Sequence, residues 1–156
     1  MQLFLPDDIL RKMRSHMIRA VHREIGGMIM GEEIGKQKFR IVDFSVDKKS
    51  GTSSGFVRNA DNHDQVLSDF FKKTNSDYSR FNYLGEWHTH PCFDIYPSEK
   101  DINSMLDLVD GTGGVDFAVL LISRLHWFWF FECGAYLFVR NQTPFVIDVI
   151  YEKYNA

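Results

Sequence analysis

The segment that most constrains this chain is GEWHTHPCFDIYPSEKD, from Gly85 to Asp101. It joins an apolar stretch typical of a strand to a loop bounded by prolines, and then to a helix start of the Ser-x-x-Asp type. Side chains two apart in a strand project from the same face, so His88 and His90 lie side by side and Glu86 shares their face. The fold must therefore bring a strand end close to the first turn of the next helix.

Two neighbouring imidazoles form a chelate for Zn²⁺, and a catalytic zinc site adds a third protein ligand and leaves one position for water. Asp101 is the candidate third ligand, because the loop from Pro91 to Pro97 can fold the helix start back over the strand end. Ser98 and Asp101 also match a capping box, which is a purely local role. The joint pattern favours a metal site over a solvated strand face followed by an ordinary helix cap.

Amide hydrolysis at such a site also needs a carboxylate that accepts a proton from water and passes it to the leaving amine. Glu24 and Glu86 are the two candidates. Glu86 shares the histidine face, whereas Glu24 begins an early strand whose place relative to the zinc depends on strand order. Local spacing does not choose between them. Cys92 is interpreted as a spectator, since nothing nearby supplies the partners of a cysteine nucleophile.

Hydrophobic periodicity predicts elements in the order helix, strands, helix, strand, helix, strands. Helices are expected at residues 5–23, 61–75 and 98–110, the first capped by Asp7 or Asp8. Strands are expected at residues 24–33, 38–47, 55–60, 82–90, 115–123, 125–133, 134–141 and 145–152. Gly26 and Gly27 in the first strand allow another backbone to approach closely. The predicted fold class is α/β, with a mixed, largely antiparallel sheet flanked by helices.

Composition narrows the function classes. The chain has 156 residues, 44% of them apolar, and no linker divides it, so we expect a single domain over residues 1–156. Its net charge is −3 and its 18 Lys and Arg are scattered, which argues against nucleic-acid binding. The N-terminus lacks a signal-peptide pattern, and the apolar stretch at residues 117–131 is too short and too polar to span a membrane. We therefore expect a cytoplasmic protein without a membrane partner.

The run from His126 to Phe131, HWFWFF, is unusually aromatic. In a strand, its two tryptophans would share one face with Phe131, and the other two phenylalanines would occupy the opposite face. We predict a strand that is buried on both faces. The alternative is a partner surface, such as a dimer contact or a groove for a substrate tail.

The segment from His88 to Asp101 resembles the signature of the JAMM (MPN+, JAB) metalloproteases, which is His-x-His, seven residues, then Ser-x-x-Asp. Every defined position matches. The family's upstream element, a Glu that opens a strand with a Gly-rich apolar run, corresponds to residues Glu24–Gly31. The likeness also covers the order of helices and strands over most of the chain. It implies an MPN/JAB-like fold and a zinc metallopeptidase.

The resemblance also implies a role for each matching residue. His88, His90 and Asp101 would hold Zn²⁺, with water as the fourth ligand. Glu24 would be the general acid/base, and Ser98 would donate a hydrogen bond to the tetrahedral oxyanion. The resemblance thereby selects Glu24 over Glu86 as the general acid/base. Glu86 becomes a neighbour that tunes or orients the site.

Members of this family cleave isopeptide or peptide bonds after the C-terminal Gly of ubiquitin or a ubiquitin-like protein. The sequence GEWHTHP is similar to that of small bacterial stand-alone members of the family. Such members accompany ubiquitin-activating-like and conjugating-like enzymes in CBASS anti-phage operons and in ubiquitin-like conjugation systems. We therefore expect a deconjugating or precursor-processing isopeptidase in a bacterial ubiquitin-like conjugation or antiviral defence system, with a ubiquitin-like protein or its conjugate as partner. Two alternatives stay open: a catalytically silent scaffold of the same fold, and a zinc hydrolase acting on a sulfur-carrier conjugate or a small peptide.

Overall fold

The computed structural model describes residues 1–47, 51–52, 55–56, 60–111, 114–127 and 129–153 of the chain. Seven strands form a closed barrel: β1 (Gln2–Pro6), β3 (Lys38–Phe44), β2 (Gly26–Gly35), β6 (Phe81–Thr89), β7 (Phe117–His126), β8 (Phe130–Val139) and β9 (Phe145–Glu152), in this spatial order. Two short strands, β4 (Gly51–Thr52) and β5 (Gly55–Phe56), pair separately. The helices are α1 (Asp7–Ala20), α2 (Ala60–Lys73) and α3 (Glu99–Asp110).

The barrel mixes two kinds of strand pair. β2–β3, β2–β6, β7–β8 and β8–β9 are antiparallel, whereas β1–β3, β1–β9 and β6–β7 are parallel. The predicted fold class, α/β with a mixed, largely antiparallel sheet and flanking helices, is confirmed. Closure of the sheet was not predicted, because it depends on β1, which pairs with both β3 and β9 and has too few residues to give a clear periodic pattern.

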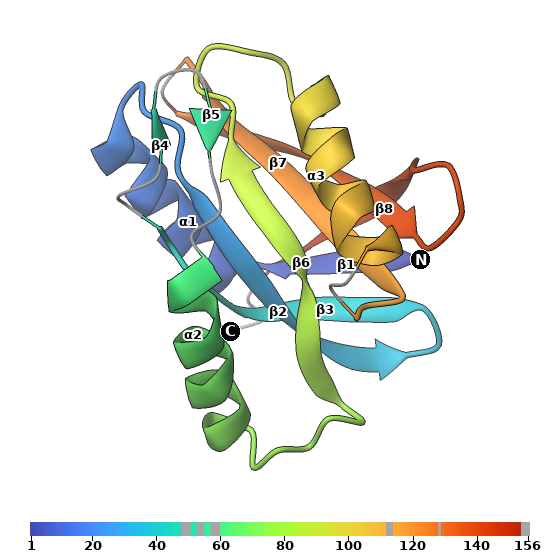
Figure 1. Cartoon of the computed structure of the whole chain (residues 1–156). Helices are drawn as coiled ribbons and strands as arrows, with labels where there is room; N and C mark the ends of the chain where they lie inside the picture. Colours follow the sequence, from blue (N-terminus) through green and yellow to red (C-terminus); the bar gives the residue numbers. More distant parts are fainter. Residues whose placement is uncertain (48–50, 53–54, 57–59, 112–113, 128, 154–156) are drawn as a thin grey trace.

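Strand β6 runs through the middle of the sheet between β2 and β7, and its end meets the loop that leads to α3 (Figure 1). Alternate residues of β7 serve two of the three apolar clusters of the described residues. On one face, Trp87 and Leu121 pack with residues of α1. On the other, Leu120 and Ile122 pack with residues of α3. Because both faces of β6 and β7 are covered, the polar side chains at the end of β6 are held in a rigid setting.

The start of α1 differs from the prediction. Its N-cap residue is Pro6, and Asp7 and Asp8 lie in the first helical turn rather than at the cap. They pair instead with Arg11 and Lys12 one turn later, at 3.0 and 3.6 Å. Strand β1 leads directly into the helix, so the chain direction is set by sheet pairing, and the two aspartates contribute through the positive end of the helix dipole.

The aromatic run was wrongly predicted to be a buried strand. β7 extends to His126 and pairs there with Phe130, so Trp127 and Trp129 lie at the connection between the two strands rather than within one. Trp127, Trp129 and Phe130 are 75%, 67% and 69% exposed. Trp127 has a φ of 54°, which a continuous strand does not adopt. The expected break between two strands near Gly134 is also wrong, since β8 runs through it; Phe128 lies outside the described residues.

Strand β2 begins at Gly26, two residues after Glu24, rather than at Glu24 as predicted. The expected close approach at the two glycines is present: a Cβ on Gly27 would collide with the backbone of Ser45, and one on Gly26 with the backbone of Trp87. None of the three helices among the described residues is long and apolar enough to be a membrane span.

Candidate metal centre

His88 lies near the end of β6, and His90 is the first residue after the strand. His88 pairs with Gly26 of β2 on one side and with Ile122 of β7 on the other. The backbone N–H of His90 continues this pairing by donating to the Ser123 carbonyl (2.9 Å). Both imidazoles are buried, 5% and 7% exposed, and their Nε2 atoms lie 3.0 Å apart. The strand periodicity therefore predicts their juxtaposition correctly.

Asp101 reaches the histidines from the first turn of α3. Ser98 is the N-cap residue, and a full capping box is formed, since the Ser98 hydroxyl accepts from the Asp101 N–H (3.2 Å) and the Ser98 N–H donates to Asp101 Oδ2 (2.8 Å). The same carboxylate lies with Oδ1 3.4 Å from His88 Nε2 and Oδ2 3.7 Å from His90 Nε2. The cap and the ligand set are thus one arrangement, because the bonds that start the helix also aim Asp101 at the imidazoles.

The three side chains have the chemistry and the spacing of a zinc-binding set. His88, His90 and Asp101 each offer one atom, and these atoms lie within 4.8 Å of one another. Tetrahedral zinc with bonds of about 2.0–2.1 Å separates its ligand atoms by about 3.3 Å. The two Nε2 atoms are 3.0 Å apart, and one Asp101 oxygen lies 3.4 Å from His88 Nε2 while the other lies 3.7 Å from His90 Nε2, all close to this value. Two imidazoles and one carboxylate are also a common donor set for catalytic zinc, so the residues fit the metal.

The electrostatics of the group follow from burial and mutual contact. Burial on its own would raise the pKa of Asp101, but hydrogen bonds from His88, His90 and Ser98 hold that pKa well below its ordinary range. For His90, burial opposes the charged form, yet hydrogen bonds to Asp101 and to the Asp94 carbonyl raise its pKa overall. The carboxylate is thus ionised at neutral pH and available as an anionic ligand.

Glu24 lies beside this group, in the turn between α1 and β2. Ile25 and Thr89 exchange two hydrogen bonds, from the Thr89 N–H to the Ile25 carbonyl (2.8 Å) and from the Ile25 N–H to Thr89 Oγ1 (3.0 Å). This extends the β2–β6 register by one pair and puts Glu24 opposite His90. Glu24 is 5% exposed, and burial raises its pKa, although nearby His88 partly offsets the rise. A carboxyl with a raised pKa suits proton transfer near neutrality.

Glu86 and Cys92 take other positions. Glu86 is 8% exposed and pairs with Met28, two residues further into β6 than His88, so it shares the histidine face as expected. Cys92 is an exposed free cysteine and does not belong to the metal-ligand group of the described residues. Cys133 is half-buried, with its Sγ 3.3 Å from the Tyr151 hydroxyl.

Sequence reasoning missed how the loop between β6 and α3 holds His90. The Nδ1 atom of His90 lies 2.7 Å from the backbone carbonyl of Asp94. A carbonyl accepts only, so Nδ1 carries the proton and Nε2 presents its lone pair to the metal position. Because the acceptor is a backbone atom, residue types carry no signal of it. Arg124, which contacts this loop, gave a weak signal as a cation within an apolar stretch.

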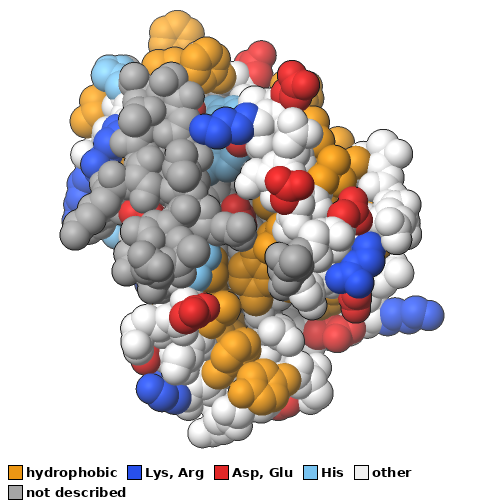
Figure 2. Space-filling model, in the orientation of Figure 1, with side chains coloured by type: hydrophobic (Ala, Val, Ile, Leu, Met, Phe, Trp, Pro, Cys, Tyr) orange, Lys and Arg blue, Asp and Glu red, His pale blue; other side chains and the backbone are white. Residues whose placement is uncertain are grey.

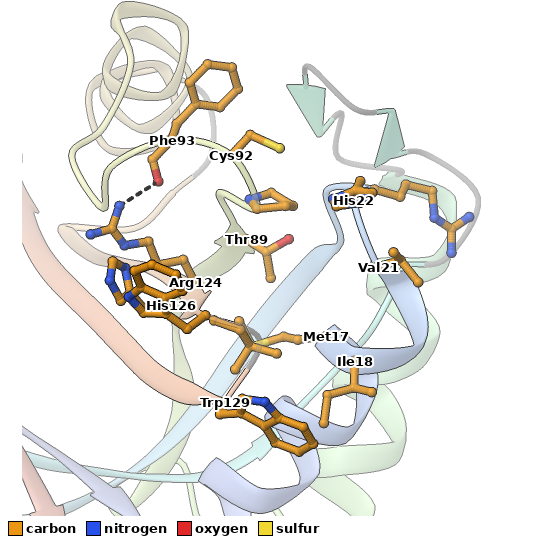
Figure 3. A pocket seen from close by; sticks show the side chains of 14 residues that line it. Met17, Ile18, Val21, His22, Thr89, Cys92, Phe93, Arg124, His126 and Trp129 are labelled. Atoms are coloured by element: carbon orange, nitrogen blue, oxygen red, sulfur yellow. Dashed lines mark hydrogen bonds between the residues drawn. The ribbon is translucent and has the colours of Figure 1, made fainter.

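A groove of about 600 Å³ adjoins the loop on the α1 side of the sheet. It lies between the end of α1, the residues after β6 and the β7–β8 hairpin, and Figure 3 shows Met17, Cys92 and Trp129 around it. On the face seen in Figure 2, histidine surface is visible in the upper half among acidic and basic side chains. The groove is separate from the metal-ligand group, since Thr89, which lines it, projects from the opposite face of β6 to His88.

Comparison with known proteins places these features in a wider group. Residues 6–135 match the profile of the family described as prokaryotic homologues of the JAB domain. The chain is 35% identical over 97 residues, 59% of its length, to the CD-NTase/cGAS isopeptidase of Escherichia coli, and the match covers 60% of that protein. It is 30% identical over 95 residues, 61% of its length, to the 26S proteasome non-ATPase regulatory subunit 14 of Dictyostelium discoideum, and covers 30% of that protein.

A third relative is the ubiquitin carboxyl-terminal hydrolase RPN11 of Saccharomyces cerevisiae, which is 26% identical over 102 residues, 65% of this chain and 32% of that protein. The chain thus matches less than two thirds of the length of each of these relatives. Among solved structures, a protein from Desulfitobacterium hafniense is similar with a TM-score of 0.66, 16% identity and coverage of 97% of this chain and 93% of that one. That likeness concerns the fold alone.

Proposed function

The chain belongs to the prokaryotic homologues of the JAB domain, and we propose that it is a zinc-dependent isopeptidase that removes or processes a ubiquitin-like protein. The observation that carries the proposal is the convergence of His88, His90 and Asp101 within 4.8 Å, with Glu24 buried beside them. The E. coli and yeast relatives bear the names isopeptidase and ubiquitin carboxyl-terminal hydrolase, which supports a deconjugating peptidase.

In this proposal His88, His90 and Asp101 hold the metal through the atoms that already face one another. When bound, zinc would lower the pKa of a water molecule and polarise the carbonyl of the scissile bond. Glu24 accepts a proton from the attacking water and delivers it to the nitrogen of the leaving amine, in keeping with its buried position opposite His90. The leaving group is the lysine or N-terminal amine of the conjugated target.

Ser98 serves two purposes in turn. Without substrate, its hydroxyl donates to Asp101 Oδ2 at 2.6 Å. With substrate, the same hydroxyl rotates about χ1 and donates to the oxyanion that forms at the scissile carbonyl. The backbone N–H of Ser98 keeps its bond to Asp101 throughout, so the carboxylate remains aimed at the metal while the hydroxyl is free to turn.

The proposed partner is a ubiquitin-like protein or its conjugate, cleaved after its C-terminal residue. We propose that this activity belongs to a bacterial ubiquitin-like conjugation or anti-phage defence system, next to activating-like and conjugating-like enzymes; the E. coli relative is named a CD-NTase/cGAS isopeptidase. The complete ligand set argues against a silent scaffold, in which one or more of His88, His90 and Asp101 would be replaced. A sulfur-carrier conjugate or a small peptide is the alternative substrate class.

The test is cleavage of a ubiquitin-like domain fused through its C-terminal Gly to a reporter protein. We expect about one zinc per chain by elemental analysis. Activity should be lost on chelation and restored by added zinc. Glu24→Gln should lower kcat by a factor of about 10²–10⁴. Its zinc content and melting temperature should stay close to those of the wild type.

Two further variants serve as controls. Glu33→Gln makes the same change at an exposed position of β2 and should leave the activity unaltered. Glu86→Gln tests the second carboxylate of the histidine face and should keep most of the activity. Full activity in Glu24→Gln would remove the assigned base. A folded, metal-free wild-type protein without cleavage activity would instead support a scaffold, and cleavage of small peptides alone would support the alternative substrate class.

A further inference from the structure

The loop that carries the partner of His90 has no regular structure of its own. Residues 91–98 between β6 and α3 contain turns and bends but no helix or strand. Yet the carbonyl of Asp94 must keep one orientation to accept from His90 Nδ1 at 2.7 Å. An irregular segment lacks the repeating hydrogen bonds of a helix or strand, so contacts with groups outside it are a principal means of fixing such a carbonyl.

Such groups are present on both sides of Asp94. Arg124 of β7 donates from Nη1 to the Phe93 carbonyl (3.3 Å) and to Asp94 Oδ1 (2.7 Å); the first of these contacts is drawn in Figure 3. The hydroxyl of Tyr136 of β8 donates to the Ile95 carbonyl (2.8 Å). The carbonyls at positions 93 and 95 therefore each accept a hydrogen bond from a side chain of the barrel, and the Asp94 carbonyl between them accepts from His90.

The barrel itself keeps the two donors in place. Arg124 and Glu132 are cross-strand partners in the β7–β8 pair, and Arg124 Nε donates to Glu132 Oε2 at 2.6 Å. Tyr136 is 8% exposed and packs in the apolar cluster under α3. Gly134 lies on β8 between Glu132 and Tyr136. A Cβ on Gly134 would stand 3.2 Å from the Ile95 carbonyl oxygen. The missing side chain lets the loop rest directly on the strand.

We propose that Arg124 and Tyr136 are positioning residues that fix the Asp94 carbonyl and thereby hold His90 with Nε2 directed at the metal position. This inference rests on the proposed metal site but extends it to two residues on other strands. The Arg124–Asp94 pair contributes little to stability, because the Asp94 side chain is 72% exposed and such pairs are screened by water. Its contribution is directional: it keeps the His90 ring in one tautomer and one orientation.

The experiment uses the full chain with Arg124→Met and Tyr136→Phe. Zinc affinity is measured by competition with a chromophoric chelator, and the Co²⁺-substituted protein gives a visible spectrum that reports ligand geometry. Loss of a partner that orients a metal-ligating histidine weakens metal binding by about 10–100-fold. We expect about tenfold for each variant, together with an altered Co²⁺ spectrum.

Arg140→Met is the matched control. Arg140 also donates to two backbone carbonyls, those of Val109 (2.9 Å) at the end of α3 and Val115 (3.2 Å) just before β7, away from the loop that holds His90. Its loss should lower the melting temperature without changing zinc affinity. If Arg124 and Tyr136 had only a structural role, their variants would also show a lower melting temperature with unchanged zinc affinity. That result would overturn the proposal.

A second readout needs no metal. The proton on His90 Nδ1, held against the Asp94 carbonyl, should give a slowly exchanging imidazole N–H signal by NMR in the metal-free protein at pH 8. We expect the signal in the wild type and in Arg140→Met, and its loss or broadening in Arg124→Met and Tyr136→Phe. If the wild type bound no zinc, the proposed function would fail, while this signal would still decide whether the two residues hold His90. Retention of the signal in both variants refutes the inference.

Discussion

Gly26 of β2 lies directly opposite His88 of β6, and a Cβ on Gly26 would stand 2.8 Å from the Cβ of His88. The same added carbon would meet the Trp87 carbonyl even more closely. The absence of a side chain at position 26 therefore allows His88, the first candidate metal ligand, to lie between its two paired strands, β2 and β7.

Gly26→Ala should consequently affect both stability and the site. Overpacking at a rigid, buried position costs about 1–3 kcal/mol, and the strain falls on His88. We expect a lower unfolding free energy by denaturant titration and weaker zinc binding by chelator competition. Gly35→Ala, at the exposed end of the same strand, meets only Lys38 side-chain atoms at 3.7 Å or more and should leave both quantities unchanged. Equal effects at the two glycines would contradict this account of position 26.

Ser98 allows the helix cap to be separated from the chemistry. Ser98→Ala removes the cap and should lower the free energy of unfolding by about 0.5–2 kcal/mol, whereas glycine at an N-cap costs only a few tenths. Both Ser98→Ala and Ser98→Gly lack the hydroxyl proposed to donate to the oxyanion, so both should lose about 10²–10³-fold in kcat. The check is to plot activity against stability for the two variants. If Ser98→Gly were as active as the wild type, Ser98 would be a cap alone.

The hairpin between β7 and β8 predicts a specific fluorescence pattern. The chain has three tryptophans: Trp87 is fully buried with its Nε1 donating to the Ser45 carbonyl (2.8 Å), while Trp127 and Trp129 are mostly exposed. The double variant Trp127→Phe/Trp129→Phe should emit at short wavelength and resist acrylamide quenching. Trp87→Phe should give the opposite, a red-shifted and easily quenched emission. Protected hairpin tryptophans in the monomeric protein would mean that this strand end is buried after all.

The two cysteines should differ in their reaction with iodoacetamide. Burial raises the pKa of Cys133 to about 11, and the thiolate is the reactive form, so at pH 8 only a small fraction of this thiol can react. Cys92 is exposed. Mass spectrometry of the folded, metal-loaded protein at pH 8 should therefore find one modification, and Cys92→Ser should abolish it. Raising the pH toward 10 should begin to label Cys133, because its thiolate fraction grows as the pH approaches its pKa.

Much of the candidate site was open to prediction because it is local. The two-residue period of a strand puts His88 and His90 on one face, and the Ser-x-x-Asp pattern starts a helix with Asp101 turned back toward its own cap. These relations hold wherever the segment is placed in a fold. Helix boundaries were likewise close, since α2 and α3 are amphipathic and their apolar faces recur with the helical period.

The largest errors concern strand pairing, which composition and hydrophobic periodicity do not encode. The aromatic run from His126 to Phe131 was predicted as a buried strand because composition favours a strand, whereas the register between β7 and β8 makes its centre a turn. Strand β1, which closes the barrel, was not predicted: its first three residues were assigned to no element, and Leu5 and Pro6 were given to the first helix. The partners of β1 lie far along the chain, whereas β7 and β8 are consecutive, and their pairing overrides the strand preference of the aromatic residues between them.

The amino-acid sequence by itself determined which side chains could bind a metal and that the two imidazoles and the carboxylate would be held on short, stiff elements. Only the tertiary structure decided what surrounds them. The β2–β6 register brought Glu24 opposite His90, and the β7–β8 pair supplied Arg124 and Tyr136 to a loop that has no regular structure of its own. The reason is physical: spacing along a chain fixes direction within one element, whereas distances between elements depend on pairing and packing over the whole barrel.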